Sequence, residues 1–490
     1  MKLNLASAFF ILCSLLILYP KNLEELFYYD DNPVRYAIAK KWVENKLSYD
    51  EKILFLAYGS SEIYIPFFYI AKFLNISYEL TYNLVSLVLF ISTLLYVMSL
   101  TRREEKNFYF ITGLFTLFGI VCVAKGSLHW FIASSIIFGV LYSKSVKILH
   151  YVMVGFSYII SPPSIVPSVL ISLALLFNGE RKKSMVFILS LPMLLVKIVL
   201  VHPIVILDAK RSLDRNFGKD IIDWSLNSFC PPDLRVFIRP ILLDYFKAPV
   251  LPALVLYTIS MRAILTKDRF AILLFSFFYV TAFFSVFIIK LQLKGYEISK
   301  YLVSIFSFIF ASNPFRHVPL LMSYLIIKSD QNKYDKILTK FILVSLFFYS
   351  ISSLIKDEGE LPTGFPKEIK SIIEFLRNSD SKNILFEGDI HTIQNNKLIH
   401  PLYNSHIIPY ISEEVEGKKF YGGIIPLYSS KYNFFAGRFN LKPLENSDIL
   451  DFIEDKKIDM VICWTDICSE FFSSSYEKEE IGKFKIIRLK

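Results

Sequence analysis

The segment FYYDDNPVRYAIAKKWVENKLSYDEKILFLAYGSSEIYIPFFYIAKFL, residues 27–74, follows one apolar run and precedes a long series of others. It opens with two adjacent carboxylates, Asp30 and Asp31, shortly after the first apolar run ends. It closes with a second apolar stretch, residues 64–74, which contains Pro66. Carboxylates placed where the chain leaves a membrane predict a site that handles a membrane-embedded substrate.

The residues after the acidic pair predict an amphipathic helix. Apolar side chains recur there at helical spacing, and charged side chains fall on the other side of the helix; the apolar set is Val34, Ala37, Ile38 and Trp42, and the charged set is Arg35, Lys40, Lys41 and Glu44. Pro33 suits the first turn of such a helix, and the carboxylates before it suit the helix N-terminus. We therefore expect a helix that lies in the plane of the membrane surface.

The composition indicates a polytopic helical membrane protein. The chain has 490 residues, of which 54% are hydrophobic, and its mean hydropathy is +0.45. The apolar residues are concentrated in long runs up to about residue 355. A net charge of +10 would suggest nucleic acid as a partner of a soluble protein. Here the excess Lys and Arg lie mostly between apolar runs, so we expect a membrane protein without a nucleic-acid partner.

About eleven segments are candidates for the ~20-residue helix that a bilayer requires. They are residues 3–20, 80–100, 107–124, 128–142, 146–161, 163–178, 184–207, 249–265, 270–290, 315–328 and 337–355. The N-terminal run has no convincing cleavage site before Lys21, so we expect a retained anchor with its N-terminus in the cytoplasm. The short loops then expected inside are basic, whereas the external turn at residues 161–164 carries no Lys or Arg.

Residues 301–311 are apolar but cover about half of the ~20 residues of a span. We expect this segment to be re-entrant or interfacial on the outer side, which keeps the number of spans odd. The C-terminal region then lies outside the cell. We expect a membrane domain over residues 1–355, with outer loops 21–79 and 208–248, and a small soluble α/β domain over residues 356–490.

The C-terminal domain shows alternating strand and helix patterns. Residues 383–386 are typical of a strand, 447–455 of a helix, 458–464 of a buried strand and 483–489 of a last strand. The five cysteines are odd in number, and Cys463 and Cys468 are not spaced like zinc ligands, so we expect no disulfide framework and interpret this pair as incidental.

The order of these features resembles the GT-C superfamily of polytopic membrane glycosyltransferases, and in particular archaeal and bacterial relatives of the protein mannosyltransferases, aminoarabinose transferases and oligosaccharyltransferases. The resemblance rests on YYDDNPVRYAIAKKW at residues 28–42, YGSSEIYIPFFYIAKFL at 58–74, NPFRHVPLLMSYLIIK at 313–328 and the tail from DILDFIEDKK at 448–457 to GKFKIIRL at 482–489. The acidic signature here is Asp-Asp, whereas the family more often has two acids separated by one residue.

The resemblance implies transfer of a sugar from a polyprenyl-phosphate donor to a protein or glycan acceptor on the outer face of the membrane. Asp31 is then the expected general base and Asp30 its partner or a ligand of a divalent metal ion. Arg316 is the expected ligand of the lipid phosphate, and the weaker candidates are Arg235, Arg239 and Lys125.

Each of these residues also has a structural interpretation. The carboxylates of Asp30 and Asp31 are also what a helix N-terminus favours, and Arg316 has the position of an interfacial anchor. The alternative function is a non-catalytic multipass protein, either a transporter or a scaffold for envelope assembly. A transporter is expected to show repeated halves, and the sequence has no internal repeat.

Overall fold

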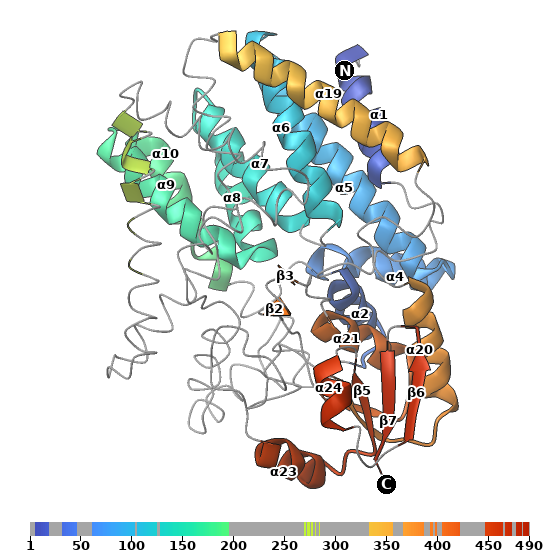
Figure 1. Cartoon of the computed structure of the whole chain (residues 1–490). Coiled ribbons are helices and arrows are strands. Elements are labelled where there is room, and N and C mark those ends of the chain that lie inside the picture. Colours follow the sequence, from blue (N-terminus) through green and yellow to red (C-terminus); the bar gives the residue numbers. More distant parts are fainter. Residues whose placement is uncertain are drawn as a thin grey trace. The chain divides into compact units, whose positions relative to one another are not determined.

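A computed structural model of the chain describes residues 5–18, 32–46, 61–102, 105–124, 128–195, 333–355, 366–386, 404–421 and 446–463, together with 466–472, 477–489 except 483, and short pieces within 269–284 and 393–398 (Figure 1). The described chain is mainly helical and has one small sheet. It divides into two compact units. The first is Met1–Leu23, Leu80–Asp208 and Asp233–Leu361; the second is Glu24–Glu79, Ala209–Pro232 and Pro362–Lys490.

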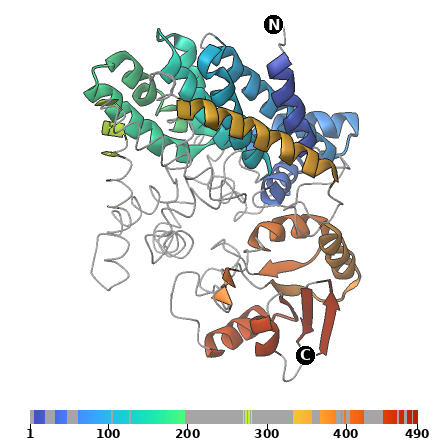
Figure 2. The ribbon, with the colours of Figure 1, turned by 45° about the horizontal axis from the view of Figure 1, so that its top comes forward.

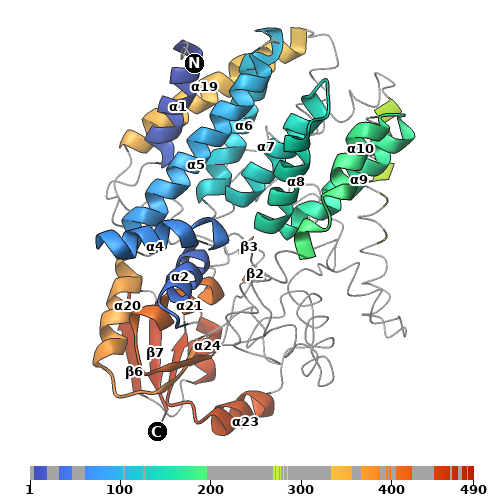
Figure 3. The ribbon, with the colours of Figure 1, turned by 180° about the vertical axis from the view of Figure 1, so that it is seen from behind.

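The first unit is made of helices. They are α1 (Leu5–Leu18), α5 (Tyr78–Thr101), α6 (Glu105–Ala124), α7 (Leu128–Tyr142), α8 (Ile148–Ile160), α9 (Ile165–Phe177), α10 (Arg181–Leu189) and α19 (Lys333–Ile355), with the short 3-10 turn η2 (Pro162–Ser164). Helices α1, α6 and α19 contact one another, and α7, α8, α10 and α9 follow beside α6 (Figures 1 and 3). Helix α19 lies alongside α1, so the two ends of this unit's sequence are neighbours in space (Figure 2).

Two glycines allow close approach between these helices. A Cβ at Gly113 of α6 would lie 2.7 Å from Cγ2 of Ile342 on α19. A Cβ at Gly119 would overlap the ring of Phe90 on α5 and come within 3.0 Å of Phe131 on α7. Small residues at helix contacts are typical of membrane bundles, where the close packing of backbones replaces the hydrophobic effect.

By length and composition, one helix among the described residues can cross a membrane. This is α5, with 24 residues and a mean hydropathy of 2.2 over its most apolar window. The other apolar helices are shorter: Leu5–Leu18, Ile65–Leu74, Asn107–Ile120, Leu128–Tyr142, Ile148–Ile160 and Ile165–Phe177. Among the described residues, helices therefore occupy seven predicted segments, the six from 3–20 to 163–178 and the last at 337–355, but the count of about eleven spans is not confirmed.

The predicted span 184–207 is wrong in its first part. Helix α10 begins at Arg181 and ends at Leu189, and Ser190 follows as its C-cap. Pro192 has no backbone N–H to continue the helical hydrogen bonds, which explains the stop at this point. The predicted spans 249–265 and 315–328, and residues 301–311, lie outside the described residues, as does most of 270–290.

The second unit contains a five-stranded mixed sheet with the order β4-β1-β5-β7-β6. Its strands are β1 (Asn383–Phe386), β4 (Lys419–Tyr421), β5 (Met460–Cys463), β6 (Glu477–Ile481) and β7 (Phe484–Arg488). Strand β1 is parallel to β4 and β5, whereas β7 runs antiparallel to both β5 and β6. The strands at 383–386, 458–464 and 483–489 are confirmed, and α23 (Asn446–Lys456) confirms the predicted helix. A separate two-stranded ladder pairs β2 (Ile393–Gln394) with β3 (Lys397–Leu398).

Helices α20 (Pro366–Asn378), α21 (Asn404–Glu414) and α24 (Asp466–Phe471) pack against this sheet. The core on one face consists of buried residues from three strands, α24 and their flanks: Leu385, Ile458, Val461, Cys463, Cys468, Phe472 and Ile487. Alternation along the strands directs Ile384, Ile462 and Ile486, which are also buried, to the opposite face.

The interpretation of Cys463 and Cys468 as incidental is wrong, because the two form a disulfide. Cys463 ends β5 and Cys468 lies in α24, with Cα atoms 5.6 Å apart, a separation that suits a disulfide. Neither cysteine belongs to a repeated spacing pattern, so the sequence did not indicate the pairing that the fold shows. Disulfides persist in oxidising compartments.

We predict that Cys463 and Cys468 will be recovered as a linked peptide when cells are quenched with an alkylating agent and the protein is mapped without reduction. The reason is that the fold brings the two cysteines together, and the expected location outside the cytoplasm would keep the disulfide oxidised. Cys13, which is buried in α1 and free, is the internal control and should be alkylated after denaturation. Recovery of Cys463 and Cys468 as alkylated thiols would place this domain in a reducing compartment.

Candidate functional site

None of the site residues predicted from the sequence lies among the described residues. Asp30, Asp31, Lys125, Arg235, Arg239 and Arg316 all fall outside them. The structure does describe the helix that the acidic pair precedes, α2 (Asn32–Val43), whose first residue follows Asp31 directly. The candidate site therefore consists of α2 and the residues that pack against it.

Local sequence signals determine where α2 begins and ends. Pro33 occupies its first turn as predicted. At the other end Asn45 has a φ of +58°, and the N–H of Lys46 donates to the carbonyl of Lys41 at 2.9 Å. This left-handed residue with its return hydrogen bond is a Schellman C-cap. Nζ of Lys72 also donates to the carbonyl of Val43, the last residue of α2, at 3.2 Å.

The charged side of α2, which the sequence placed opposite the apolar side, is packed against protein. Arg35 is 2% exposed and Lys41 is 7% exposed, as deeply buried as the apolar face. The reason is tertiary, since α21, α4 (Ile65–Leu74) and the 3-10 turn η1 (Ser61–Ile63) all contact α2. A buried cation is rarely retained unless it is paired or functional, so Arg35 joins the candidate residues.

An aromatic cluster fixes α2 at Tyr36. Its ring lies 5.9 Å from the ring of Phe68 on α4 and 5.8 Å from the ring of Tyr410 on α21, measured between centroids. Its hydroxyl donates to the carboxylate of Glu79. The side chain is fully buried. Tyr36 thus joins three segments of the chain through one side chain, with both its apolar body and its polar tip satisfied.

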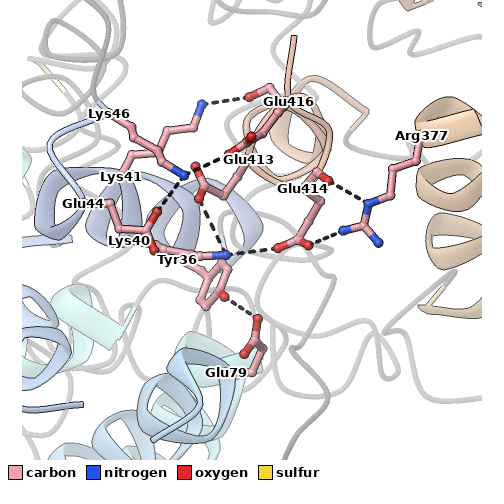
Figure 4. A network of polar contacts seen from close by, with 11 residues as sticks. Tyr36, Lys40, Lys41, Glu44, Lys46, Glu79, Arg377, Glu413, Glu414 and Glu416 are labelled. Carbon is pink, nitrogen blue, oxygen red and sulfur yellow. Dashed lines mark hydrogen bonds and ion pairs between the residues drawn. The ribbon is translucent and has the colours of Figure 1, made fainter. Parts of the chain in front are cut away.

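Lysines of α2 face glutamates of α21 (Figure 4). Nζ of Lys40 lies 3.2 Å from Oε1 of Glu414 and 3.6 Å from Oε1 of Glu413. Beside it, Nζ of Lys41 donates to Oγ of Ser412 at 2.9 Å. At the end of the row, Nζ of Lys46 lies 3.2 Å from Oε1 of Glu416. These residues define the α2–α21 interface.

The interface is extended to α20 through Arg377. Its Nη2 lies 2.8 Å from Oε2 of Glu414, and its Nε donates to the carbonyl of the same residue at 2.9 Å. Glu414 therefore receives one cation from α2 and another from α20 (Figure 4). One carboxylate that accepts from both helices fixes α2 to the α/β fold, because displacing either helix leaves a charge partly buried without its partner.

The ionisable groups at the interface have shifted pKa values. Burial lowers the pKa of Lys40, but the carboxylates of Glu414 and Glu413 outweigh it and raise that pKa above its ordinary value of 10.5. For Glu413, burial raises the pKa more than Lys40 and Lys41 lower it. Burial, together with the neighbouring charge of Glu79, raises the pKa of Tyr36. At neutral pH Lys40 is therefore a cation and Tyr36 a hydrogen-bond donor.

This arrangement positions residues but does not itself resemble a set of catalytic groups. Lys40, Lys46 and Arg377 are each paired with a carboxylate. Among the described residues no three His, Cys, Asp or Glu side chains are grouped as metal ligands. Its role is to hold the C-terminal half of α2, the helix whose first residue follows Asp31 in the sequence. Arg35, in the first turn of α2, is buried.

Sequence reasoning missed the acidic half of the interface. The run SEEVEG at residues 412–417 carries three glutamates, and the run KKWVENK at 40–46 carries three lysines. Their opposite charge is the signal that could have paired them. It was too weak to use, because about 370 residues separate the two runs and neither has a recognisable motif.

We predict that Lys40→Met will lower the unfolding free energy by about 2 kcal/mol, because it leaves Glu413 and Glu414 partly buried without their shared cation. Lys46→Met is the matched control and should cost less than about 1 kcal/mol, since the side chain of Lys46 is 49% exposed. Both values come from denaturant unfolding of the purified full-length protein in detergent, followed by tryptophan fluorescence. Equal effects of the two substitutions would contradict the importance assigned to Lys40.

The raised pKa of Lys40 predicts a loss of stability in alkali. The folded state binds the Lys40 proton more tightly than the unfolded state, so this stabilisation is complete below pH 10.5 and is lost as pH rises through the raised pKa. The melting temperature of the wild type should therefore fall more steeply above pH 10.5 than that of Lys40→Met. If the plots of melting temperature against pH are parallel for the wild type and Lys40→Met, the pKa of Lys40 is not raised by folding.

Comparison of the chain with protein-family models, with curated proteins and with solved structures found no match.

Proposed function

We propose that the chain is a polytopic membrane glycosyltransferase of the GT-C type, which transfers a sugar from a polyprenyl-phosphate donor to a protein or glycan on the outer face of the membrane. In this proposal the membrane domain has about eleven spans, its N-terminus is cytoplasmic and its C-terminal α/β domain is extracytoplasmic. The observation that carries the proposal is the α2–α21 interface, because it joins the segment after Asp30 and Asp31 to the C-terminal domain.

The interface constrains the topology. Residues 24–79 and 362–490 belong to one compact unit, so both must lie on the same side of any membrane that the chain crosses. The chain between them must then cross an even number of times. The ten spans predicted between residues 80 and 355 would satisfy this condition; the crossing predicted at 184–207 must then lie C-terminal to α10, which ends at Leu189. A crossing by residues 301–311 would add an eleventh and break it, which supports a re-entrant or interfacial segment there.

One further feature favours the outer face, and a second favours contact with a membrane surface. The Cys463–Cys468 disulfide belongs to the same unit and suits an oxidising compartment. Helix α4 of this unit presents large apolar side chains that protein does not cover; Phe67, Tyr69, Ile70, Phe73 and Leu74 are between 40% and 88% exposed. An apolar face of this kind suits contact with the membrane surface.

The proposed chemistry assigns a role to each candidate residue. Asp31 acts as general base on an acceptor hydroxyl, and Asp30 assists it or binds a divalent metal ion that neutralises the leaving phosphate. Arg316 binds the lipid phosphate, with Arg235, Arg239 and Lys125 as further candidates. Arg35, one helical turn into α2, is added to this set because it is buried near the acidic pair in sequence.

A non-catalytic scaffold is the second candidate. It is favoured by the pairing of Lys40, Lys46 and Arg377 with glutamates, which gives the described interface a structural role without spare catalytic groups. The two candidates share the same topology and differ in whether wild-type protein transfers sugar.

We predict that Asp31→Asn will reduce sugar transfer about 100-fold or more while leaving expression and melting temperature unchanged. Asn keeps the size of the side chain and an oxygen that can cap α2, but it cannot accept the proton. Asp50→Asn, in the same loop, is the matched control and should retain activity. The assay follows radiolabelled sugar from polyprenyl-phosphate donors in membranes. Full activity of Asp31→Asn would refute the site, and wild type without transfer from any donor would favour the scaffold.

The topology predicts that Asn45→Cys and Glu416→Cys behave alike. Both positions are exposed and lie in the second unit. In intact cells, each introduced thiol should react with an impermeant maleimide, whereas a thiol introduced at Lys144 in an expected inner loop should react only after permeabilisation. Labelling of one position of the first pair without the other would refute the even number of crossings.

A further inference from the structure

A basic groove in the first unit lies between the N-terminal ends of α8 and α10. It is open and has a volume of about 750 Å³. Three cationic side chains line it, Lys147, Arg181 and Lys182. Its apolar lining includes Ile148, Met185 and Leu189. The groove therefore combines a cluster of positive charge with an apolar wall.

The charges in the groove oppose the local backbone field. Arg181 and Lys182 are the first two residues of α10, and Lys147 is the N-cap of α8. Neither helix has an acidic residue in its first turn, and the acid nearest to these ends is Glu180, the N-cap of α10. The N-terminus of a helix carries partial positive charge, so cations at this position reduce helix stability. Three such cations at two adjacent helix ends are unfavourable unless an anion neutralises them.

No described carboxylate forms an ion pair with Lys147, Arg181 or Lys182. Glu180 is the neighbouring acid, and it pairs with Lys183, whose Nζ lies 3.0 Å from Oε2 of Glu180. Lys183 also donates to the carbonyl of Leu141 at 2.9 Å, so this pair is anchored toward α7. Among the described residues, the three groove cations therefore have no carboxylate partner.

The walls of the groove are held together by side-chain hydrogen bonds. Oγ of Ser190, which caps α10, donates to the carbonyl of Tyr151 on α8 at 2.9 Å. The hydroxyl of Tyr158 on α8 donates to the carbonyl of Phe187 on α10 at 3.1 Å. These bonds fix the distance between the two helices, so a ligand would meet a preformed groove and not have to order it.

Apolar exposure continues from the groove along both helices. Ile148 is 83% exposed, Met185 is 40% exposed and Leu189 is 57% exposed. Along α8, Leu149 and Val152 are also more than half exposed. A free phosphate ion would leave these apolar side chains exposed to water. An acyl chain attached to the anion would cover it, at about 25 cal/mol for each Å² removed from water.

We propose that this groove binds an anionic phospholipid of the cytoplasmic leaflet, with the headgroup phosphate at Lys147, Arg181 and Lys182 and an acyl chain against Ile148, Met185 and Leu189. The proposal rests on the membrane location proposed above, since the loops at 143–147 and 178–182 are then cytoplasmic, but it does not depend on sugar transfer. Arg181 offers the planar fork that pairs with phosphate oxygens, and the lysines supply the remaining charge.

The test measures lipid binding by the purified full-length protein in detergent, by native mass spectrometry and by the shift in melting temperature. The variant replaces Lys147, Arg181 and Lys182 with Gln. The control variant replaces Arg102, Lys144 and Lys336 with Gln, which removes the same charge from exposed positions outside the groove. The probes are phosphatidylglycerol, phosphatidylcholine with the same acyl chains, and inorganic phosphate.

We expect phosphatidylglycerol to bind the wild type and the control variant equally and the groove variant at least tenfold more weakly. Phosphatidylcholine and inorganic phosphate should give no comparable shift. Without lipid, the groove variant should melt at or above the wild-type temperature, because the substitutions remove charges that oppose two helix ends. An unchanged or raised melting temperature distinguishes loss of the binding site from loss of folding.

Equal binding of phosphatidylglycerol by the groove variant and the wild type would overturn the proposal, and so would an equal loss in the control variant, which would indicate diffuse attraction. A shift produced by inorganic phosphate alone would show an anion site without a lipid. Should the triple variant fail to fold, Arg181→Gln is measured against Arg102→Gln with the same criteria. Lipid binding without sugar transfer would support this proposal and count against the proposed activity. Sugar transfer without lipid binding would do the reverse.

Discussion

The second unit depends on one buried charge arrangement, Lys40 of α2 between Glu413 and Glu414 of α21. A lysine that is largely removed from water loses its hydration, and two carboxylates within 3.6 Å compensate for that loss. The pairing restrains α2 relative to α20 as well, because Glu414 also forms an ion pair with Arg377 of α20. An apolar contact of similar area would hold α2 near the sheet but would tolerate sliding. The ion pairs and the hydrogen bond from Tyr36 to Glu79 fix its position.

This constraint connects two regions that are remote in sequence. The hairpin of α2 and α4 comes before the long series of apolar helices, and the α/β fold comes after it. Because they form one folded unit, the chain between them must return to the side from which it left. For a membrane protein that condition is stricter than any reading of loop charges, since it depends on packing and not on a statistical excess of Lys and Arg. It also means that α2, which follows Asp30 and Asp31 in the sequence, packs against the C-terminal domain.

The two units use charge in opposite ways. At the α2–α21 interface cations meet carboxylates of the same unit, so the charges are satisfied internally and contribute to position. In the groove between α8 and α10 the cations gather at helix N-termini, where the backbone repels them, and the one neighbouring acid is held by Lys183. The proposed phospholipid would supply the negative charge that the protein itself does not place there. The contrast separates structural cations from binding cations more clearly than their number does.

The sequence by itself determined the local elements. Apolar runs with few charges gave helices at 80–100, 107–124, 128–142 and 163–178, and short β-branched runs gave β1, β5 and β7, because these patterns act through the nearest neighbours in the chain. Tertiary structure alone decided the burial of Arg35 and Lys41, the Cys463–Cys468 disulfide and the union of residues 24–79 with the C-terminal domain. The amphipathic pattern of α2 predicted a charged face in water, but a second helix with complementary glutamates covers that face. Such pairing depends on partners hundreds of residues away, and no local pattern specifies them.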